Sequence, residues 1–331
     1  MDRVIVTGGA GFIGSHVCKA LAKAGFEPVT YDNFSRGNRA AVQFGPLVEG
    51  DIRDVDRLSS AMRAHSAVGV IHMAAFAYVR ESVEDPLLYY DNNVIGSIRI
   101  VQAMRQTGVN HIVFSSTCAT YGMVQRVPIE EDDATQPINP YGASKLMIER
   151  VLRDADPIGV RSISVRYFNA CGSDPDGQIG EWHDPETHII PVALMAARGE
   201  IEQLTLYGDQ HPTPDGTTIR DYIHVQDLAK AHVQALRHLL GGAASDIFNL
   251  GNGNGYSIRD VFAAIKRVTD LDVPFMVAPA NPGDPPILVA SSAKARNILG
   301  FAPEFTKLDD MIGHAWAWRQ KAAAAFGRAD R

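Results

Sequence analysis

A tyrosine and a lysine four residues apart are the pair in this sequence best suited to acid–base chemistry. Tyr141 and Lys145 follow Asn139-Pro140, at the start of a stretch with helical spacing. Residues at i and i+4 share one face of a helix, so the ammonium can lie near the phenol. A free tyrosine titrates near ~10 and is a poor base at neutral pH, but a neighbouring cation favours the phenolate. We therefore interpret Tyr141 as a candidate base whose pKa is lowered by Lys145.

Hydroxyl side chains end a predicted strand about two dozen positions before this pair. The run Phe114-Ser115-Ser116-Thr117 reads as such a strand, and a hydroxyl at the carboxyl edge of a parallel sheet can hydrogen-bond a reacting alcohol. The Tyr-x-x-x-Lys pattern alone often occurs by chance, on exposed helices that carry both residues. Its combination with Thr117 favours a catalytic group.

A glycine-rich turn stands between the first predicted strand and the first predicted helix. Within Thr7-Gly8-Gly9-Ala10-Gly11-Phe12-Ile13-Gly14, the spacing fits either GxxGxxG, with Gly8, Gly11 and Gly14, or GxGxxG. Glycine lets the backbone turn sharply and approach a pyrophosphate, whose charge the helix N-terminus stabilises. A plain tight turn is the alternative interpretation, because a lone glycine pattern is a weak signal.

An acidic residue after the second predicted strand strengthens the interpretation as a dinucleotide site. Asp32 lies 18 residues after Gly14, close to the ~20 expected of the acid that binds the adenosine ribose. Its carboxylate repels a 2′-phosphate, so we expect NAD rather than NADP. Arg36 lies close by, and its positive charge makes this preference strong rather than absolute. The oxidised nicotinamide ring would also favour a Tyr141 phenolate.

These residues need a scaffold, and the sequence predicts an α/β fold. Short β-branched runs near residues 4–6, 28–31, 69–72, 111–114 and 162–165 alternate with helical patterns near 13–24, 54–64 and 92–106. Strands that are apolar throughout imply a doubly wound parallel sheet of the Rossmann type, covered on both faces. We expect an NAD-binding domain at 1–168 plus 221–250. A smaller C-terminal α/β domain for substrate binding is expected at 169–220 plus 251–331.

Composition excludes several other classes. The 331 residues are 46% hydrophobic and carry a net charge of −7, without a basic cluster, so neither nucleic acid nor a membrane surface is an expected partner. No signal peptide or membrane-length apolar run is apparent, and three scattered cysteines fit a reducing cytoplasm. Cys171, His183 and His188 have residue types that bind zinc, but no tight ligand pair and no fourth partner stands out, so no metal is expected.

With these motifs in place, the chain resembles the extended short-chain dehydrogenase/reductase superfamily, and within it the UDP-sugar 4-epimerases. The resemblance covers almost the whole chain. It rests on these segments: Thr7–His16, Glu49–Arg53, Tyr89–Asn93, Ser115–Gly122, Asn139–Lys145, Arg166–Asn169, Pro185–His188 and Asp215–Val225. The phrase Ser116–Gly122 is especially similar to the branch that includes UDP-arabinose and UDP-xylose 4-epimerases, although UDP-glucose epimerases carry it too.

The resemblance implies a role for each matching residue. Tyr141 would be the base, Lys145 would lower its pKa and bind the nicotinamide ribose, and Thr117 would bond the sugar 4-oxygen. The implied NAD contacts are Gly8, Gly11, Phe12, Ile13, Gly14, Asp32, Asn33, Asp51, Ile52, Ala74, Ala75, Asn92, Tyr141, Lys145 and Phe168. The implied contacts to the substrate nucleotide are Asn169, His188, Tyr207 (stacking on uracil), Arg220 (on the diphosphate) and Asp284.

The sequence departs from the family pattern at the substrate end. Relatives carry a diphosphate-binding Arg where this chain has Asn281, and an amide cannot replace a charge-assisted, often bidentate contact. Arg80 stands where relatives usually have Gly, so it is either a solvated loop residue or the compensating cation. Leu288 occupies the position that gates the sugar 2-substituent, and its intermediate bulk leaves N-acetylated sugars open.

The expected function is NAD-dependent 4-epimerisation of a nucleotide sugar by transient oxidation at C4, with UDP-glucose and UDP-galactose as the pair. Alternatives are a UDP-arabinose/UDP-xylose or UDP-N-acetylglucosamine 4-epimerase. A dehydratase or decarboxylase is less favoured, because Cys118 and Ala119 stand where those enzymes need acids. A non-catalytic NAD-sensing protein is a further alternative that need not keep Tyr141, Lys145 and Thr117. A homodimer is expected, because the helix at 92–106 is more apolar than one sheet face needs.

Overall fold

A seven-stranded parallel sheet forms the larger part of the molecule, as predicted. The computed structural model describes residues 1–281 and 284–326; the last residues of the predicted substrate domain, 327–331, lie outside the described residues. The strand order is β10-β6-β5-β4-β1-β2-β3. The strands are β1 (Arg3–Thr7), β2 (Glu27–Asp32), β3 (Leu47–Glu49), β4 (Ala67–His72), β5 (His111–Thr117), β6 (Arg161–Tyr167) and β10 (Asp246–Leu250).

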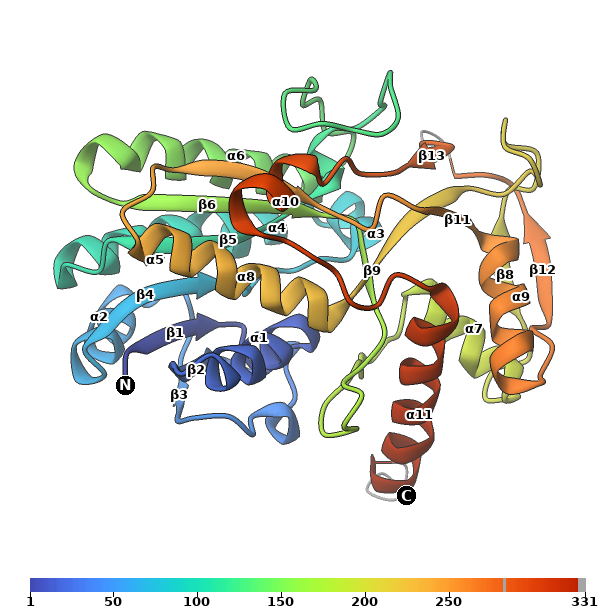
Figure 1. The fold of residues 1–331 in the computed structure, drawn as a ribbon, viewed down its shortest axis with the longest axis horizontal. Coiled ribbons are helices and arrows are strands. Elements are labelled where there is room, and N and C mark those ends of the chain that lie inside the picture. Colours follow the sequence, from blue (N-terminus) through green and yellow to red (C-terminus); the bar gives the residue numbers. More distant parts are fainter. Residues whose placement is uncertain (282–283, 327–331) are drawn as a thin grey trace.

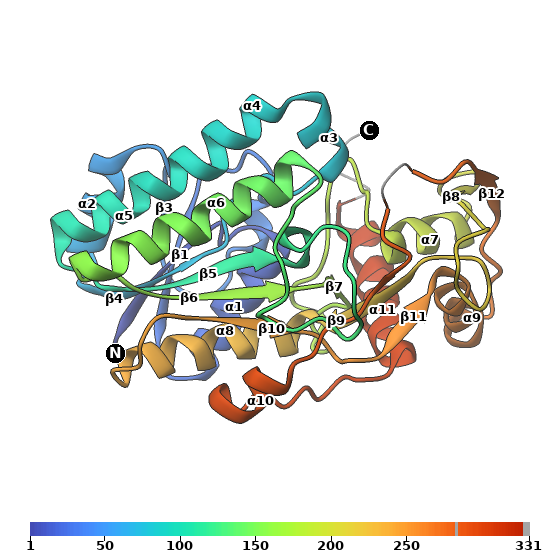
Figure 2. The ribbon, with the colours of Figure 1, turned by 90° about the horizontal axis from the view of Figure 1, so that it is seen from above.

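Helices cover both faces of this sheet (Figure 2). One face packs on α1 (Phe12–Lys23) and α8 (Val225–Leu240), with α10 (Ala293–Leu299) beside α8. The other packs on α2 (Val55–Ala64), α5 (Gly96–Thr107) and α6 (Pro140–Ala155). The central strands are therefore buried on both sides, which explains their continuous apolar runs. None of the helices that the structure describes is long and apolar enough to cross a membrane.

The strand order reverses between β1 and β4, and this determines where a ligand can bind. From β1 the chain proceeds outward to β2 and β3, and then returns to the other side of β1 with β4 and β5. The connections on the two sides leave a crevice at the carboxyl ends of the strands, the usual ligand site of an open α/β sheet. Thr7, His72 and Thr117 end strands at this edge.

The helix predicted at 92–106 differs from expectation at its start. A π-helical segment (Tyr90–Ile95) precedes α5, and Gly108 ends α5 in the left-handed conformation at φ 76°. Within the π-helical segment, the Asn93 amide is buried and binds both the N–H and the C=O of Phe76. Wide turns of this kind often occur at functional sites, and here the turn places Asn92 on the crevice.

A smaller α/β region lies beyond the carboxyl edge of the sheet (right side of Figure 1). Its strands are β7 (Asn169–Cys171), β9 (Ile219–His224), β11 (Gly255–Ser257) and β13 (Ile287–Leu288), with a second pair β8 (Leu204–Tyr207) and β12 (Phe275–Ala278). Its helices α7 (Ile189–Ala197), α9 (Ile258–Thr269) and α11 (Leu308–Phe326) share one apolar core. The predicted domain boundary at 220/221 falls inside β9, so the division of the chain stays a prediction.

Short elements complete the described chain. Two helices, α3 (Val79–Glu84) and α4 (Pro86–Tyr89), precede the π-helical segment, and single 3₁₀ turns span Arg39–Ala41, Cys118–Thr120 and Asp156–Ile158. Ser257 caps α9: its hydroxyl accepts the Asp260 N–H, and the Asp260 carboxylate accepts the Ser257 N–H, which forms a reciprocal capping box.

Candidate active site

The glycine turn after β1 leaves no room for side chains. Gly8 adopts φ 71°, and a Cβ there would lie 2.6 Å from the backbone nitrogen of Ala74. A Cβ on Gly14 would lie 2.0 Å from the carbonyl oxygen of Gly8, which itself accepts the Gly11 N–H. The turn therefore presents bare backbone at the N-terminus of α1, which suits a pyrophosphate.

Asp32 ends β2 beside this turn, as predicted for a ribose-binding acid. Its carboxylate is 8% exposed and accepts the backbone N–H groups of Ala10 and Phe34 at 3.0 and 2.8 Å. Burial raises the pKa of this carboxyl, while the two N–H donors oppose that shift. Arg36, whose positive charge we expected to weaken the preference for NAD over NADP, forms an ion pair with Glu81.

Asn33 and Asp51 meet at the far end of the same crevice. The Asn33 amide donates to Asp51 at 3.0 Å, and Arg53 forms a close ion pair with Asp51. The hydrogen bond from Arg53 lowers the pKa of Asp51 to about 2, so the group is an acceptor throughout the neutral range. Ile52 lies beside it on the wall of the crevice.

Tyr141, Lys145 and Thr117 converge at the carboxyl edge of β5. Asn139 caps α6 by accepting the Gly142 N–H at 2.8 Å, which fixes the first turn of the helix that carries the pair. The Lys145 ammonium donates to the carbonyl of Ser115 at 2.8 Å and lies 5.9 Å from the centre of the Tyr141 ring. Lys145 is 3% exposed and Tyr141 is 9% exposed.

Burial acts on both members of this pair. It raises the pKa of Tyr141, with neighbouring Tyr167 adding to the rise, while a hydrogen bond with Thr117 acts in the opposite direction. Burial lowers the pKa of the Lys145 ammonium to about 7, against an opposing attraction from Glu149. The predicted lowering of the Tyr141 pKa by Lys145 therefore stays a prediction, and its size depends on how much positive charge Lys145 retains.

A buried network that no sequence pattern indicated anchors β5 at Ser116, the residue before Thr117. Glu149 of α6 accepts from the Ser116 hydroxyl at 2.5 Å and forms a bidentate ion pair with Arg166 of β6. Both charged side chains are at most 3% exposed. The network ties α6 to β5 and β6, so the helix carrying Tyr141 cannot shift without breaking it.

The other end of the crevice, which we expected to bind the substrate, is formed largely by loops and short strands of the smaller region. The Arg220 guanidinium donates to the carbonyls of Ile219 and Pro285. Asn281 bonds Asp284 at 3.1 Å, and Arg80 approaches Asn281 at 3.5 Å from across the crevice. The Arg80 guanidinium also lies over the ring of Tyr207, 4.5 Å from its centre. Arg80 thus contacts Asn281, which replaces the usual arginine of the family, and Tyr207, the implied uracil contact.

One cavity of about 970 Å³ joins these two ends. With the exception of Asp51, which stands just behind its wall, each site residue predicted from the sequence lines this cavity. That set includes Ala74, Ala75, Asn92, Phe168, Asn169 and His188, as well as Arg80, Asn281 and Leu288. The bare glycine turn, the buried Asp32 and the apolar walls fit the dinucleotide that the sequence analysis expected.

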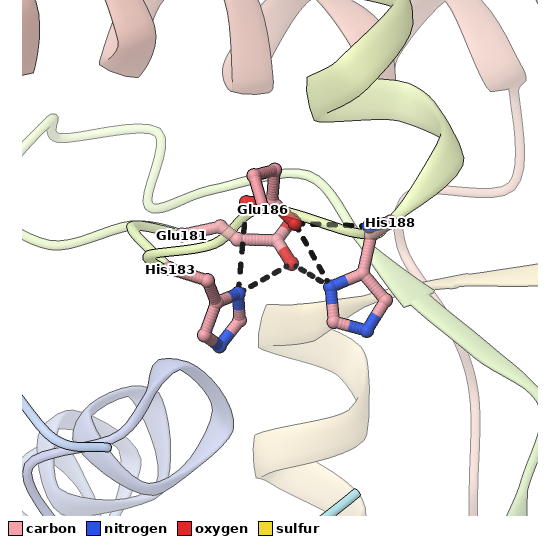
Figure 3. Close-up of side chains that lie close together, drawn as sticks. All are labelled: Glu181, His183, Glu186 and His188. Carbon is pink, nitrogen blue, oxygen red and sulfur yellow. Dashed lines mark hydrogen bonds and ion pairs between the residues drawn. The ribbon is translucent and has the colours of Figure 1, made fainter. Parts of the chain in front are cut away.

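A cluster of two glutamates and two histidines borders the cavity on the loop before α7 (Figure 3), and only its two histidines were expected from the sequence as metal-binding residue types. His183 and His188 each approach Glu181 and Glu186 within 3.6 Å. Burial opposes protonation, but these carboxylates raise the pKa of His183 to about 9 and that of His188 to about 10. Cys171, grouped with the histidines from sequence, instead contacts Met311. The missed signal was the alternation of glutamate and histidine along this segment, in the order Glu181, His183, Glu186 and His188.

Comparisons with known proteins agree with this geometry. Residues 4–251 match the NAD dependent epimerase/dehydratase family. A UDP-glucose 4-epimerase of Rhizobium leguminosarum bv. trifolii is 47% identical over 97% of this chain and 98% of its own length. A crystal structure of UDP-glucose 4-epimerase from Brucella ovis in complex with NAD superposes with a TM-score of 0.94 at 51% identity, covering 96% of this chain and 98% of that one.

A further solved structure contains both a cofactor and a nucleotide sugar. The UDP-glucose-4-epimerase from Stenotrophomonas maltophila, with bound NAD and formylated UDP-arabinopyranose, superposes with a TM-score of 0.95 at 36% identity. It covers 98% of this chain and 100% of its own. The fold, the cavity and these similarities together establish that the chain belongs to the NAD dependent epimerase/dehydratase family, and within it to the UDP-sugar 4-epimerases.

Proposed function

We propose that this chain is an NAD-dependent UDP-glucose 4-epimerase that interconverts UDP-glucose and UDP-galactose. The observation that carries the proposal is one cavity in which Tyr141, Lys145 and Thr117 converge between a dinucleotide turn and a set of nucleotide contacts. Relatives of nearly the same length carry the same name at 45–47% identity. The glycine turn and Asp32 would hold NAD, which would supply a reversible hydride acceptor for the sugar C4.

The chain's own residues manage the proton and the position of the sugar. Tyr141, as a phenolate, would take the proton of the sugar 4-hydroxyl and give it back after the 4-keto sugar has turned over. Thr117 would hydrogen-bond the same oxygen. Lys145, one turn further along α6, would stabilise the phenolate. Affinity would come from the nucleotide, because the sugar itself must be held loosely enough to rotate.

The residues after Thr117 argue against elimination of water. Burial raises the pKa of the Cys118 thiol to about 12, and Ala119 has no titratable group. Neither can act as a general acid or base near neutral pH. The 4-keto sugar would therefore be reduced again without loss of water.

We further propose that Arg80 supplies the cation that Asn281 lacks. Arg80 reaches Asn281 and Tyr207 from the first turn of α3, so its guanidinium stands where uracil and diphosphate would meet. Together with Arg220 and Asp284 on the opposite wall, it would form the nucleotide-binding end of the cavity.

Pentose substrates are a second candidate. The Stenotrophomonas enzyme binds formylated UDP-arabinopyranose, so UDP-arabinose and UDP-xylose are the alternative substrate pair that we test. Leu288 on the cavity wall leaves UDP-N-acetylglucosamine as an alternative. The test is incubation with UDP-glucose, UDP-galactose, UDP-N-acetylglucosamine and UDP-xylose separately, followed by chromatographic resolution. A dominant glucose/galactose interconversion is expected, and turnover of none of the four would contradict the proposal.

We also propose a homodimer through the helical layer that contains α5 and α6, which lie side by side on one sheet face (Figure 2). Large apolar side chains are exposed around this layer: Leu87 at 75%, Met147 at 46% and Ile95 at 40%. Light scattering at micromolar concentration should report the dimer mass, and a monomer would overturn the proposal. A cytoplasmic location is proposed as well, because Cys18, Cys118 and Cys171 are free thiols.

A further inference from the structure

Four potential metal ligands gather on the loop that leads into α7. Glu181, His183, Glu186 and His188 follow a Glu-x-His-x-x-Glu-x-His spacing, and their ligand atoms all lie within 4.8 Å of one another. Figure 3 shows both imidazole rings turning their Nδ1 atoms toward the carboxylates. The residues come from one short segment, so a single bound ion would fix the whole loop.

The separations between ligand atoms fit a four-coordinate site. His183 Nδ1 lies 3.3 Å from Glu181 Oε1 and 3.6 Å from Glu186 Oε2, and His188 Nδ1 lies 3.3 Å from Glu186 Oε1. Ligands bound to zinc at about 2.0–2.2 Å in a tetrahedron stand about 3.4 Å apart. His188 Nδ1 and Glu181 Oε1, at 2.6 Å, would need to separate by about 0.8 Å to reach that spacing.

Burial and unsatisfied atoms point to a ligand at the centre. The Glu181 and Glu186 side chains are only 5% and 6% exposed. Glu181 Oε1 and His183 Nδ1 are buried and have no hydrogen bond of acceptable geometry, although both lie within ion-pair distance of their neighbours. Such atoms are costly unless something else satisfies them, and lone pairs directed at a shared centre are satisfied by a cation.

The surroundings hold the carboxylates in position. Glu186 Oε1 accepts the backbone N–H groups of Thr187 and His188 at 2.8 and 2.9 Å. The indole of Trp318 donates to the carbonyl of Glu181 at 3.0 Å, which anchors the loop to α11. Metal-binding carboxylates are typically oriented by hydrogen bonds of this kind.

We propose that Glu181, His183, Glu186 and His188 bind one divalent transition-metal ion of the zinc type, in a structural role. Two carboxylates balance the charge of the ion, and imidazole with carboxylate ligands suits zinc better than magnesium or calcium. Four protein ligands leave no open position, so the ion would act as a clamp that presents Thr187 and His188 to the cavity. The proposal does not depend on which sugar the protein converts.

A competing explanation needs no metal. Two imidazolium ions could balance the same two carboxylates, and the cluster would then be a set of buried ion pairs. The two explanations differ in what the untagged protein binds, because only the first requires a stoichiometric ion.

Elemental analysis and cobalt substitution distinguish them. Untagged protein, stripped with a chelator and then exposed to Zn²⁺ and desalted, should retain about one zinc per chain and regain any thermal stability lost on stripping. Mg²⁺ should not replace Zn²⁺. Co²⁺ should give the intense visible absorption of a four-coordinate ion. Retention of less than about a tenth of a zinc per chain, or a cobalt spectrum typical of the hydrated ion, would overturn the proposal.

Variants locate the ion. His183→Gln and Glu186→Gln should each weaken zinc binding by about tenfold or more, whereas His65→Asn, at the amino end of the sheet, should bind like the wild type. Equal zinc content in wild type and both cluster variants would place the ion elsewhere and contradict the proposal. Circular dichroism checks folding; if a cluster variant unfolds, the cobalt spectrum of the wild-type chain decides the question alone.

Discussion

The two ends of the cavity are built in different ways. The part of the cofactor end expected to hold the pyrophosphate and the adenosine ribose comes from one continuous stretch, in which β1, the glycine turn, α1 and β2 follow each other within the first 32 residues. The substrate end is assembled from segments far apart in the sequence, such as Arg80 and Asn281, which are 201 residues apart. A local motif therefore defines the first end, whereas only the tertiary fold creates the second.

The chemical basis of recognition differs as well. The cofactor end would bind its ligand through backbone N–H groups at glycine positions, where any side chain would block the close approach. The substrate end uses long side chains, and a charge lost at one position can be replaced from another. Arg80 beside Asn281 is consistent with such an exchange. Variants at the two ends should therefore fail in different ways.

The largest effect is expected where the two ends meet, at Tyr141. Tyr141→Phe removes only the hydroxyl that transfers the proton, so turnover should fall by ~10²–10⁴-fold while fold and NAD content persist. Epimerase assays, with NAD released by denaturation as the occupancy measure, check this. Retention of more than about a tenth of the wild-type rate would remove Tyr141 from the mechanism.

A glycine substitution should damage the cofactor end alone. A Cβ at position 14 would meet the Gly8 carbonyl oxygen at 2.0 Å, and overpacking of this kind costs about 1–3 kcal/mol, or roughly 5- to 150-fold in affinity. Gly14→Ala should therefore purify with little NAD. Gly241→Ala is the matched control, because a Cβ there meets no atom closer than 3.3 Å. Equal NAD content in the two variants would contradict the close-approach argument.

The same division explains what could be predicted from sequence. The parallel sheet, the glycine turn, Asp32 and the Tyr141–Lys145 pair were readable, because each depends on spacing within one or two neighbouring elements. The π-helical start before α5 was not, since it depends on Asn93 bonding the distant Phe76. Hydrophobic periodicity carries no signal for such a tertiary contact.

The substrate end was predictable as a set of residue types and not as an arrangement. Arg80 had two interpretations, and only the fold brings it to Asn281 and Tyr207. The histidines of the loop before α7 were noticed, but they were paired with Cys171, and Glu181 and Glu186 were overlooked. Glutamates are common on surfaces, and burial, which the sequence does not reveal, makes these two distinctive.

A double-variant cycle at the substrate end sharpens the comparison. If Arg80 compensates for Asn281, Arg80→Ala should weaken UDP binding by roughly ten- to a hundred-fold, the worth of a charge-assisted hydrogen bond at about 1.5–3 kcal/mol. Asn281→Arg should restore more affinity in the Arg80→Ala background than it adds to the wild type. Calorimetric titration of UDP into the four proteins measures both effects, and NAD content should stay constant.

The outcome of that cycle separates compensation from simple proximity. Equal affinity of wild type and Arg80→Ala would show that Arg80 only stacks on Tyr207, leaving Arg220 to bind the diphosphate. Additive effects of the two substitutions would show that the residues act independently, because coupled neighbours deviate from additivity.

The smallest effect is expected from the charge of Lys145. Burial lowers the pKa of its ammonium to about 7, so Lys145 is protonated below that pH and loses its charge as pH rises through it. Burial also raises the pKa of Tyr141, so the phenolate depends on whatever cation stands near it. In Lys145→Met that cation is gone, the phenol holds its proton more tightly, and the acid limb of the activity profile should move to higher pH by about one unit. Lys145→Arg keeps a charge with different geometry and should shift the limb less. A limb at the same pH in wild type and Lys145→Met would mean that Lys145 positions the cofactor or the helix without tuning Tyr141.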